Sequence, residues 1–212
     1  MDLIKGQVIQ EGSPVPQGKP DVREMRSMEC HERHGREALL RTLDTCLSGR
    51  TFTIDDREIR FRLLKKEDAE LWTEFVNGCS PESLWYRFMV PFRATPERAQ
   101  RFCDIDPQRE LAIVAEMDEG ARRRIVGIAR LIRISDSNRA EFAVIVSDPL
   151  QRRTLGRTLS EVSVGMVRQW GVESVFSETL MENHAMIKVL KRCRFTVEER
   201  NGNMFTMSLK LS

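Results

Sequence analysis

The pattern of hydrophobic and polar positions after residue 50 alternates between the two-residue period of strands and the period of about 3.6 residues of helices. Ile59, Phe61 and Leu63 alternate with charged residues, which predicts a half-exposed strand over residues 57–64. Apolar residues at helical spacing follow, and two of these segments begin with Ser-Pro or Thr-Pro, pairs that favour a helix N-terminus. The segments with helical signatures cover residues 65–78, 80–89 and 95–105.

Strands dominate the middle of the chain. Residues 140–148 are apolar on both faces, with Phe142, Val144 and Val146 against Ala143 and Ile145, which is typical of a buried central strand. The expected order is β-α-α-β-β-β-α-β-α-β-β, an α/β protein of the α+β kind with a mixed sheet. Strands are predicted at 110–117, 124–134, 140–148, 173–180, 194–199 and 203–211, the last two as a hairpin over Asn201-Gly202, and helices at 156–170 and 183–193.

The first 50 residues have a different character. Residues 11–21 contain three prolines and two glycines, which indicates a linker or extended arm. Residues 28–49 place Leu39, Leu43 and Leu47 at helical spacing. We therefore expect residues 1–50 to form an N-terminal extension, an arm plus a helix, docked on a domain of residues 51–212.

Composition and charge exclude several classes of function. The 212 residues are 41% hydrophobic and 31% charged, with 34 Lys and Arg against 32 Asp and Glu, so a net charge of +2 gives no reason to expect a nucleic-acid partner. No apolar run approaches the roughly 20 residues of a membrane span, and the first residues lack a signal-peptide core. Five scattered cysteines without C-x-x-C spacing indicate reduced thiols, so we expect a cytoplasmic protein with no membrane partner.

The turn after the central strand is suited to phosphate. The pattern of residues 148–162 predicts the end of a strand, a short basic turn and the start of a helix. At a helix start, backbone N–H groups lack partners and the helix dipole is positive, so phosphate binds there. Arg152, Arg153 and Arg157 add cationic side chains at this point. The turn therefore predicts a site for a phosphorylated ligand.

The stretch from Glu141 to Phe195 resembles the core of the GNAT-fold N-acetyltransferases. It contains their strand, a turn similar to Q-x-x-G-x-G/A, a helix, a strand and an Asn-led helix that ends just before a phenylalanine. Gln151 and Gly156 match the first and last positions of the turn, whereas Thr154 departs in the middle. Two further segments, "SPESLWYRFMVPFR" and "DIDPQRELAIVAE", resemble a narrower group, the bacterial protein lysine acetyltransferases of the Pat type, which modify acyl-CoA synthetases.

This resemblance implies a GNAT acyl-CoA N-acyltransferase fold and an enzyme that uses acetyl-CoA as acyl donor without a metal. It also implies that the acetyl group goes to a lysine of a protein partner similar to an acyl-CoA synthetase. In such enzymes the central strand parts from the next strand, and the pantetheine arm pairs with the free edge. The cofactor-binding residues that it implies are Val144, Ile145, Val146, Gln151, Arg152, Arg153, Thr154, Leu155, Gly156, Arg157 and Asn183.

A lysine acceptor requires a proton acceptor. With a free pKa near 10.4, only about 1 amine in 2,500 is neutral at pH 7, a cost of about 4.6 kcal/mol that a general base helps to offset. Glu141 lies where Pat-like enzymes place their catalytic glutamate, and Glu178 is the second candidate. The tyrosine that many GNAT enzymes use as general acid corresponds to Leu190 here, and Tyr86 is the only tyrosine in the chain.

Two positions lack the expected glycine. If position 154 needs a positive φ, threonine there is strained; if only close approach of a ligand matters, its side chain either crowds the pyrophosphate or donates a hydrogen bond to it. Arg194 likewise replaces the glycine usual before Phe195, which we interpret as a local backbone variation.

Other readings of the chain stay open. Its acceptor could instead be a small-molecule amine, or the protein could be an acyl-CoA-binding regulatory module without turnover. Cys30, His31 and His34 are near neighbours with metal-capable side chains, but one helix would not direct all three at one ion and a fourth ligand is lacking, so no metal site is expected.

Overall fold

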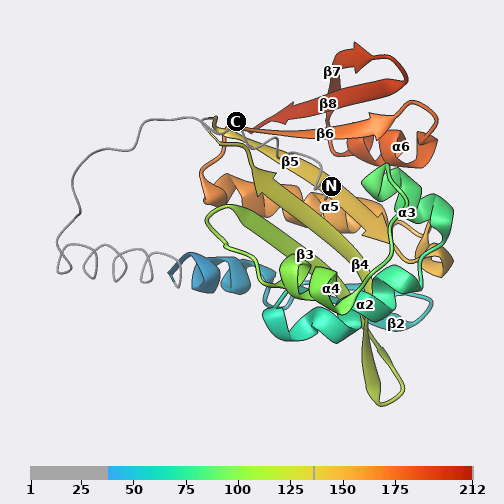
Figure 1. Ribbon diagram of the computed structural model, residues 1–212. Coiled ribbons are helices and arrows are strands. Elements are labelled where there is room, and N and C mark those ends of the chain that lie inside the picture. The colour runs from blue at the N-terminus through green and yellow to red at the C-terminus, as the bar shows by residue number, and fades with distance from the viewer. Residues whose placement is uncertain (1–37, 136, 212) are drawn as a thin grey trace, which may run out of the picture.

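The computed structural model describes residues 38–135 and 137–211, in which one mixed sheet has helices on both faces (Figure 1). The strand order is β1-β2-β3-β4-β5-β6-β8-β7, with β5 and β6 parallel and the other neighbours antiparallel. The strands are β1 Thr51–Ile54, β2 Arg57–Leu63, β3 Glu110–Glu119, β4 Arg122–Arg133, β5 Arg139–Val146, β6 Ser174–Leu180, β7 Thr196–Asn201 and β8 Met204–Lys210. The helices are 38–47, α2 Ala69–Asn77, α3 Pro81–Phe88, α4 Pro96–Cys103, α5 Leu155–Val167 and α6 His184–Arg192, with short 3-10 turns at Lys66–Asp68, Asp148–Leu150 and Arg168–Trp170.

Two apolar layers hold the helices to the sheet. On one face, α5, α6 and helix 38–47 bury side chains such as Leu159, Leu190 and Leu43 against the strands. On the other face, α2, α3 and α4 pack on residues of the central strands, among them Val114 and Ile128. Because successive side chains of a strand point to opposite faces, the strands in the middle of the sheet contribute to both layers.

The expected fold class is confirmed, with two differences in the order of elements. The strand β1 was not predicted, because four residues are too few to show an alternation; it forms a hairpin with β2 through Asp55 and Asp56, which both have positive φ (49° and 61°). Three helices lie between β2 and β3, as the three segments with helical signatures predict, although the expected order of elements counted two.

The helix predicted near the N-terminus is present at residues 38–47 and joins the main core. Leu43 and Leu47 are buried in the same layer as α5, and Cys46 Sγ donates to Gln169 Oε1 at 3.0 Å. The proline-rich arm predicted at residues 11–21 lies outside the described residues. The domain boundary at residue 50 therefore stays a prediction.

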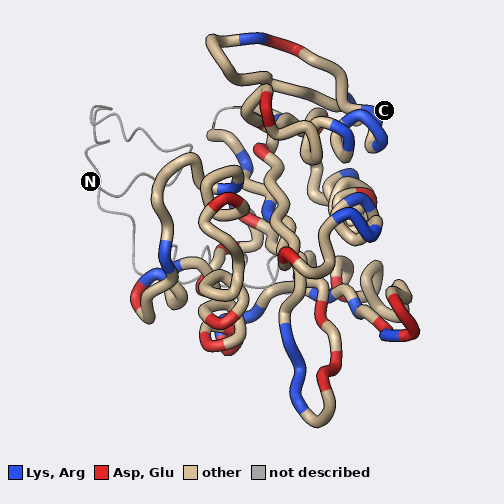
Figure 2. Tube along the Cα trace, turned by 90° about the vertical axis from the view of Figure 1, so that its right-hand side faces the viewer, with Lys and Arg blue, Asp and Glu red and all other residues tan. Residues whose placement is uncertain are grey.

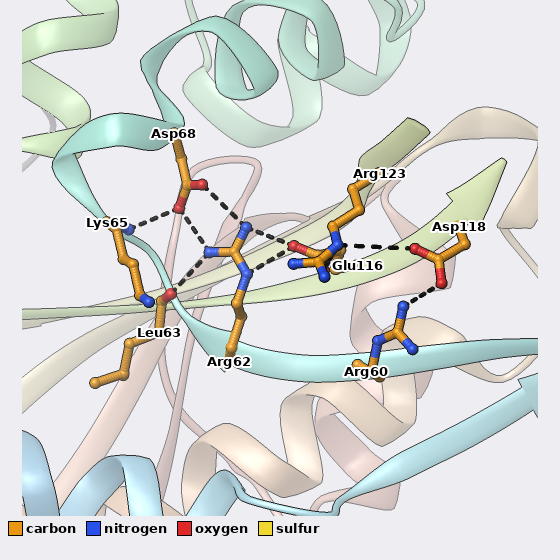
Figure 3. A network of polar contacts seen from close by, with 8 residues as sticks. All are labelled: Arg60, Arg62, Leu63, Lys65, Asp68, Glu116, Asp118 and Arg123. Carbon is orange, nitrogen blue, oxygen red and sulfur yellow. Dashed lines mark hydrogen bonds and ion pairs between the residues drawn. The ribbon is translucent and has the colours of Figure 1, made fainter. Parts of the chain in front are cut away.

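An ion-pair network fixes the start of α2 to the sheet (Figure 3). Arg62 on β2 pairs with Asp68 at 2.6 Å and with Glu116 on β3 at 2.6 Å, and the side chain of Glu116 is only 3% exposed. Asp68 also accepts the Lys65 N–H at 2.8 Å. Arg62 is thus the nearest cation to two buried carboxylates, and Glu116 has a second, more distant partner in Arg123 at 3.7 Å; removing Arg62 should therefore cost stability.

The β3–β4 hairpin continues this charge pattern outward. Its two arms project beyond the helices, with arginines along one arm and carboxylates along the other (Figure 2). The register places Arg123 opposite Asp118 and Arg122 opposite Glu119. Opposite charges in cross-strand pairs stabilise such a hairpin modestly.

Candidate active site

β5 and β6 pair only where they begin. Their register comprises Arg139–Ser174, Ala140–Val175 and Glu141–Phe176, after which β5 continues to Val146 along β4 and β6 continues to Leu180 along β8. Figure 1 shows the two strands diverging beyond this point. The parting expected from the sequence is therefore present, and it leaves the β6 side of β5 open to an extended ligand.

The open part of β5 contains the three residues expected to line the pantetheine. Ile145 and Val146 are buried and Val144 is half-buried, because their side chains pack into the two apolar layers. The backbone groups of this segment are therefore the main contacts that it can offer a ligand. Cofactor binding by Val144, Ile145 and Val146 stays a prediction.

The turn after β5 presents a run of backbone donors. Gln151 N–H donates to the Asp148 carbonyl at 3.2 Å, and its side-chain amide donates to the Val146 carbonyl at 3.1 Å, so Gln151 is engaged in holding the turn. From Arg152 to Arg157, in contrast, the structure shows no backbone carbonyl among the described residues that accepts the N–H groups. These donors, at and before the N-terminus of α5, form a cradle of the kind that binds phosphate.

The structure shows that Thr154 has the positive φ required by the first of the two explanations. Its φ is +69° and its ψ −13°, the left-handed conformation that favours glycine, and Arg152 also has a positive φ of 60°. Thr154 Oγ1 donates to the Arg153 carbonyl rather than capping α5. The turn keeps a glycine-type backbone and is strained by a β-branched residue.

The arginines of the turn are not all directed at its donors. Arg153 pairs with Asp55 of the β1–β2 turn, and Arg157 donates to Glu161 one turn further along α5 at 2.8 Å. Such exposed pairs are weak, so both side chains can be recruited by a ligand. Without a ligand, the positive charges expected around the turn are therefore partly neutralised by carboxylates of the protein itself.

Asn183 caps the last helix. Its side chain accepts from the Met186 N–H at 3.0 Å and is largely buried. This capping role fully accounts for an asparagine at the position. Contact with pantetheine stays a prediction.

Glu141 is the last residue of β5 that pairs with β6, and it lies half-buried on the face covered by α2, α3 and α4. Arg87 of α3 is within electrostatic range of it. Burial, together with repulsion from Arg130, lowers the pKa of Arg87 to about 10, whereas the carboxylates of Glu141 and Glu110 act in the opposite direction. Sequence reasoning did not single out Arg87, because nothing in the helical pattern of α3 shows which strand residue it faces.

Glu178 lies on the other side of the parting. It is exposed and follows Phe176, the partner of Glu141, by two residues on β6. The alternation of side chains puts it on the same sheet face as Glu141. Both candidate bases therefore border the place where the strands separate.

Comparison with known proteins identifies the family. A profile described as "Acetyltransferase (GNAT) domain" matches residues 58–196. The chain belongs to the GNAT acetyltransferase family. It is similar to acetyltransferase PA5475 of Pseudomonas aeruginosa, with 31% identity over 133 residues that cover 62% of this chain and 72% of the relative.

Two solved GNAT structures share the architecture. The GNAT domain of S. lividans PAT has 25% identity and a TM-score of 0.68, covering 76% of this chain and 97% of that one. Spermidine N-acetyltransferase from Vibrio cholerae, solved with CoA and spermine, has 19% identity and a TM-score of 0.60, covering 72% and 95%. The GNAT fold is confirmed, and membership of this acetyltransferase family supports acetyl-CoA as the acyl donor.

The usual GNAT tyrosine has no counterpart in the last helix of this protein. Leu190, which occupies that position, is fully buried in the core. Tyr86 lies instead on α3, where burial and then the carboxylates of Glu182 and Glu82 raise its pKa. Tyr86 therefore stays protonated near neutral pH and lies near the loop that precedes α6.

Two further observations bear on cofactors and membranes. In residues 38–135 and 137–211, no group of three or more His, Cys, Asp and Glu side chains could hold a metal ion. Cys30, His31 and His34 lie outside these ranges. None of the helices in the described ranges is both long and apolar enough to cross a membrane.

Proposed function

We propose that this GNAT protein transfers the acetyl group of acetyl-CoA to the side-chain amine of a lysine on a protein, with Glu141 as the general base. The observation that carries the proposal is the position of Glu141 at the last β5–β6 pair, directly before the open edge of β5. A thioester bound along that edge would have its reacting carbonyl near this carboxylate. The location of the protein in the cytoplasm stays a prediction.

The donor is proposed to bind along β5 and the turn that follows. The pantetheine would pair with backbone groups of Val144 to Val146, and the pyrophosphate would accept from the N–H groups of Arg152 to Arg157. A side chain at Gly156 would point into ordinary van der Waals contact, with Val146 Cγ2 at 3.7 Å, so the protein itself does not require glycine there. Glycine at this position is therefore explained by close approach of a ligand.

The reaction is a direct transfer. Glu141 takes a proton from the lysine ammonium, and the neutral amine attacks the thioester carbonyl to form the new C–N bond. A β5 backbone N–H can stabilise the oxyanion of the tetrahedral intermediate. Its collapse breaks the C–S bond and releases the CoA thiolate, a good leaving group, while the nitrogen gives up its second proton, which solvent can pass to the thiolate.

Features of α3 support a cationic acceptor presented by a protein. Trp85 is 43% exposed on this helix, and the neighbouring Tyr86 lies near the carboxylates of Glu82 and Glu182. Carboxylates and an exposed indole attract a lysine side chain. This helix also contains the segment that resembles Pat-type enzymes, and the S. lividans PAT domain has a similar fold. The resemblance to Pat-type enzymes is the reason for proposing an acyl-CoA synthetase as acceptor.

The test is Glu141→Gln, which keeps the shape but removes the basicity. With an acyl-CoA synthetase as acceptor, thiol release should fall by roughly 10²–10⁴, while calorimetric affinity for acetyl-CoA stays within a few-fold. Raising the pH should restore part of the rate, because more of the acceptor amine is then neutral.

Glu178→Gln is the matched control and should keep most of the rate. Near-normal turnover of Glu141→Gln would remove Glu141 from the catalytic role and make Glu178 the base to test. Acetylation of free amines but not of the synthetase would favour a small-molecule enzyme. Acetyl-CoA binding without any turnover would favour a regulatory module.

A further inference from the structure

The carboxylate of Asp148 joins two parts of the molecule that are 68 residues apart in the chain. It begins the 3-10 turn two residues after β5 and accepts three hydrogen bonds from the start of α3. Ser80 donates from its N–H at 2.9 Å and its hydroxyl at 2.6 Å, and Ser83 donates from its hydroxyl at 2.8 Å. None of these groups has a part in the chemistry proposed above.

Gln151 extends this network into the turn. Its amide donates to Ser83 Oγ at 2.8 Å and to the Val146 carbonyl at 3.1 Å. The end of β5, the turn and the first turn of α3 are thus connected through Asp148 and Gln151. We call these four side chains, Ser80, Ser83, Asp148 and Gln151, the Asp148 bridge.

The Asp148 bridge also keeps the negative charge of Asp148 away from the N–H groups of residues 152–157. A carboxylate four residues before Arg152 would repel a pyrophosphate if it pointed at the turn. Here it faces the N-terminus of α3, where N–H groups and the helix dipole stabilise an anion. Partial burial opposes its ionisation, but the hydrogen bonds from Ser80 and Ser83 prevail and hold the pKa of Asp148 below its usual value.

The helix at the other end of the Asp148 bridge borders the acceptor side. α3 contains Arg87, which lies within electrostatic range of Glu141, and Tyr86, which lies near Glu182. A shift of the first turn of α3 relative to β5 would move these side chains relative to the candidate base. The bridge therefore connects the donor turn to the acceptor side by direct hydrogen bonds.

We propose that Asp148 is a positioning residue that couples acetyl-CoA binding at the turn to the placement of α3 beside Glu141. The inference rests on the proposed binding of acetyl-CoA at residues 152–157. Because coupling is reciprocal, donor binding should stabilise the first turn of α3, and weakening the attachment of α3 should lower donor affinity.

Amide hydrogen exchange and calorimetry with acetyl-CoA test this coupling. In the wild-type protein acetyl-CoA should slow exchange at residues 152–157 and also at Ser83 and Leu84, whose N–H groups bond to Ser80. Ser80→Ala should raise the dissociation constant about fivefold or more and abolish the protection at α3.

Thr95→Ala is the matched control. Thr95 caps α4 as Ser80 caps α3, each before a Pro-Glu pair, and Thr95 accepts from the Arg98 N–H at 3.3 Å without any contact to the turn. It should leave the acetyl-CoA dissociation constant within about twofold, because losing a cap alone changes stability and not this site. Ser83→Ala, which keeps the cap oxygen of Ser80, is the second variant if Ser80→Ala does not fold, and should act in the same direction.

The outcomes separate the two proposals. Protection of residues 152–157 without any effect at α3, or unchanged affinity in Ser80→Ala and Ser83→Ala, overturns the coupling and leaves the donor site intact. Binding of acetyl-CoA without protection of residues 152–157 overturns the donor site and, with it, the coupling.

Discussion

Replacing Thr154 with glycine should stabilise the protein, because the structure holds this residue at a φ of +69°. A left-handed conformation costs an L-residue roughly 1–2 kcal/mol, whereas glycine adopts it freely. The extra backbone entropy of glycine in the unfolded chain offsets about 0.4–1 kcal/mol of this. The side chain is exposed and its hydroxyl contacts only the neighbouring Arg153 carbonyl, so little packing is lost. The net gain should be about 0.5–1 kcal/mol.

Thermal unfolding followed by circular dichroism measures this gain as a rise in Tm of about 1–4 °C for a domain of this size. Thr158→Gly is the matched control, since Thr158 lies within α5 and its side chain is half-buried. There, glycine should lower the free energy of unfolding by about 0.3–0.5 kcal/mol or more, because it is the poorer helix former. Opposite signs for the same substitution would show that strain at Thr154 is responsible.

Thr154→Gly should also tighten acetyl-CoA binding, because it removes a β-branched side chain where the pyrophosphate is expected to approach. Calorimetry on the two variants measures this directly. The strain argument fails if Thr154→Gly lowers stability as Thr158→Gly does. The crowding argument fails separately if Thr154→Gly weakens binding at unchanged stability, since the hydroxyl would then be a ligand contact.

Three further predictions concern the donor turn, the ion-pair network and the thiols. Gly156→Leu should raise the acetyl-CoA dissociation constant at least tenfold, about 1.4 kcal/mol, whereas unchanged affinity in a folded variant would contradict the proposed site. Arg62→Met should destabilise by about 3 kcal/mol in urea unfolding, because it removes the ion pair of Asp68 and leaves the buried Glu116 with the more distant Arg123 at 3.7 Å. Lys66→Met breaks an exposed pair with Asp104 at 2.8 Å and should cost less than about 1 kcal/mol; equal losses would refute the reasoning. Burial raises the pKa of the Cys79 thiol to about 12. In the unfolded chain the thiol ionises near pH 8.5, so the free energy of unfolding is undiminished by this thiol below about that pH and falls as the pH rises towards 12. Urea unfolding between pH 8 and 11 should show a shallower alkaline loss for Cys79→Ala, and an identical slope would contradict this assignment.

Much of the fold followed from local patterns. The strands and helices from residue 57 onward were predicted because burial on one or both faces leaves a periodic trace in the sequence. The caps at Ser80 and Thr95 followed from the Ser-Pro and Thr-Pro pairs, and both side chains accept the expected N–H groups. The four-residue strand β1 was missed, because its only support is pairing with β2.

The candidate site was predicted only in part. The sequence indicated the turn through its basic helix start and Glu141 through a family resemblance, and the structure adds that the β5–β6 pairing ends at Glu141. The sequence could not show that Arg153 forms an ion pair with Asp55. Nor could it show that both missing glycines mark positive φ angles, +69° at Thr154 and +67° at Arg194.

The sequence by itself determined most of the strands and helices from residue 57 onward, and it indicated the turn that is proposed to bind phosphate. These features depend on neighbours within a few residues, where the hydrophobic period and the capping groups act. Only the tertiary structure decided that Asp148 accepts from Ser80 and Ser83, and that Arg87 lies near Glu141. Such contacts depend on how α3 is placed across the sheet, and that placement is set by packing between segments far apart in the chain rather than by any local pattern.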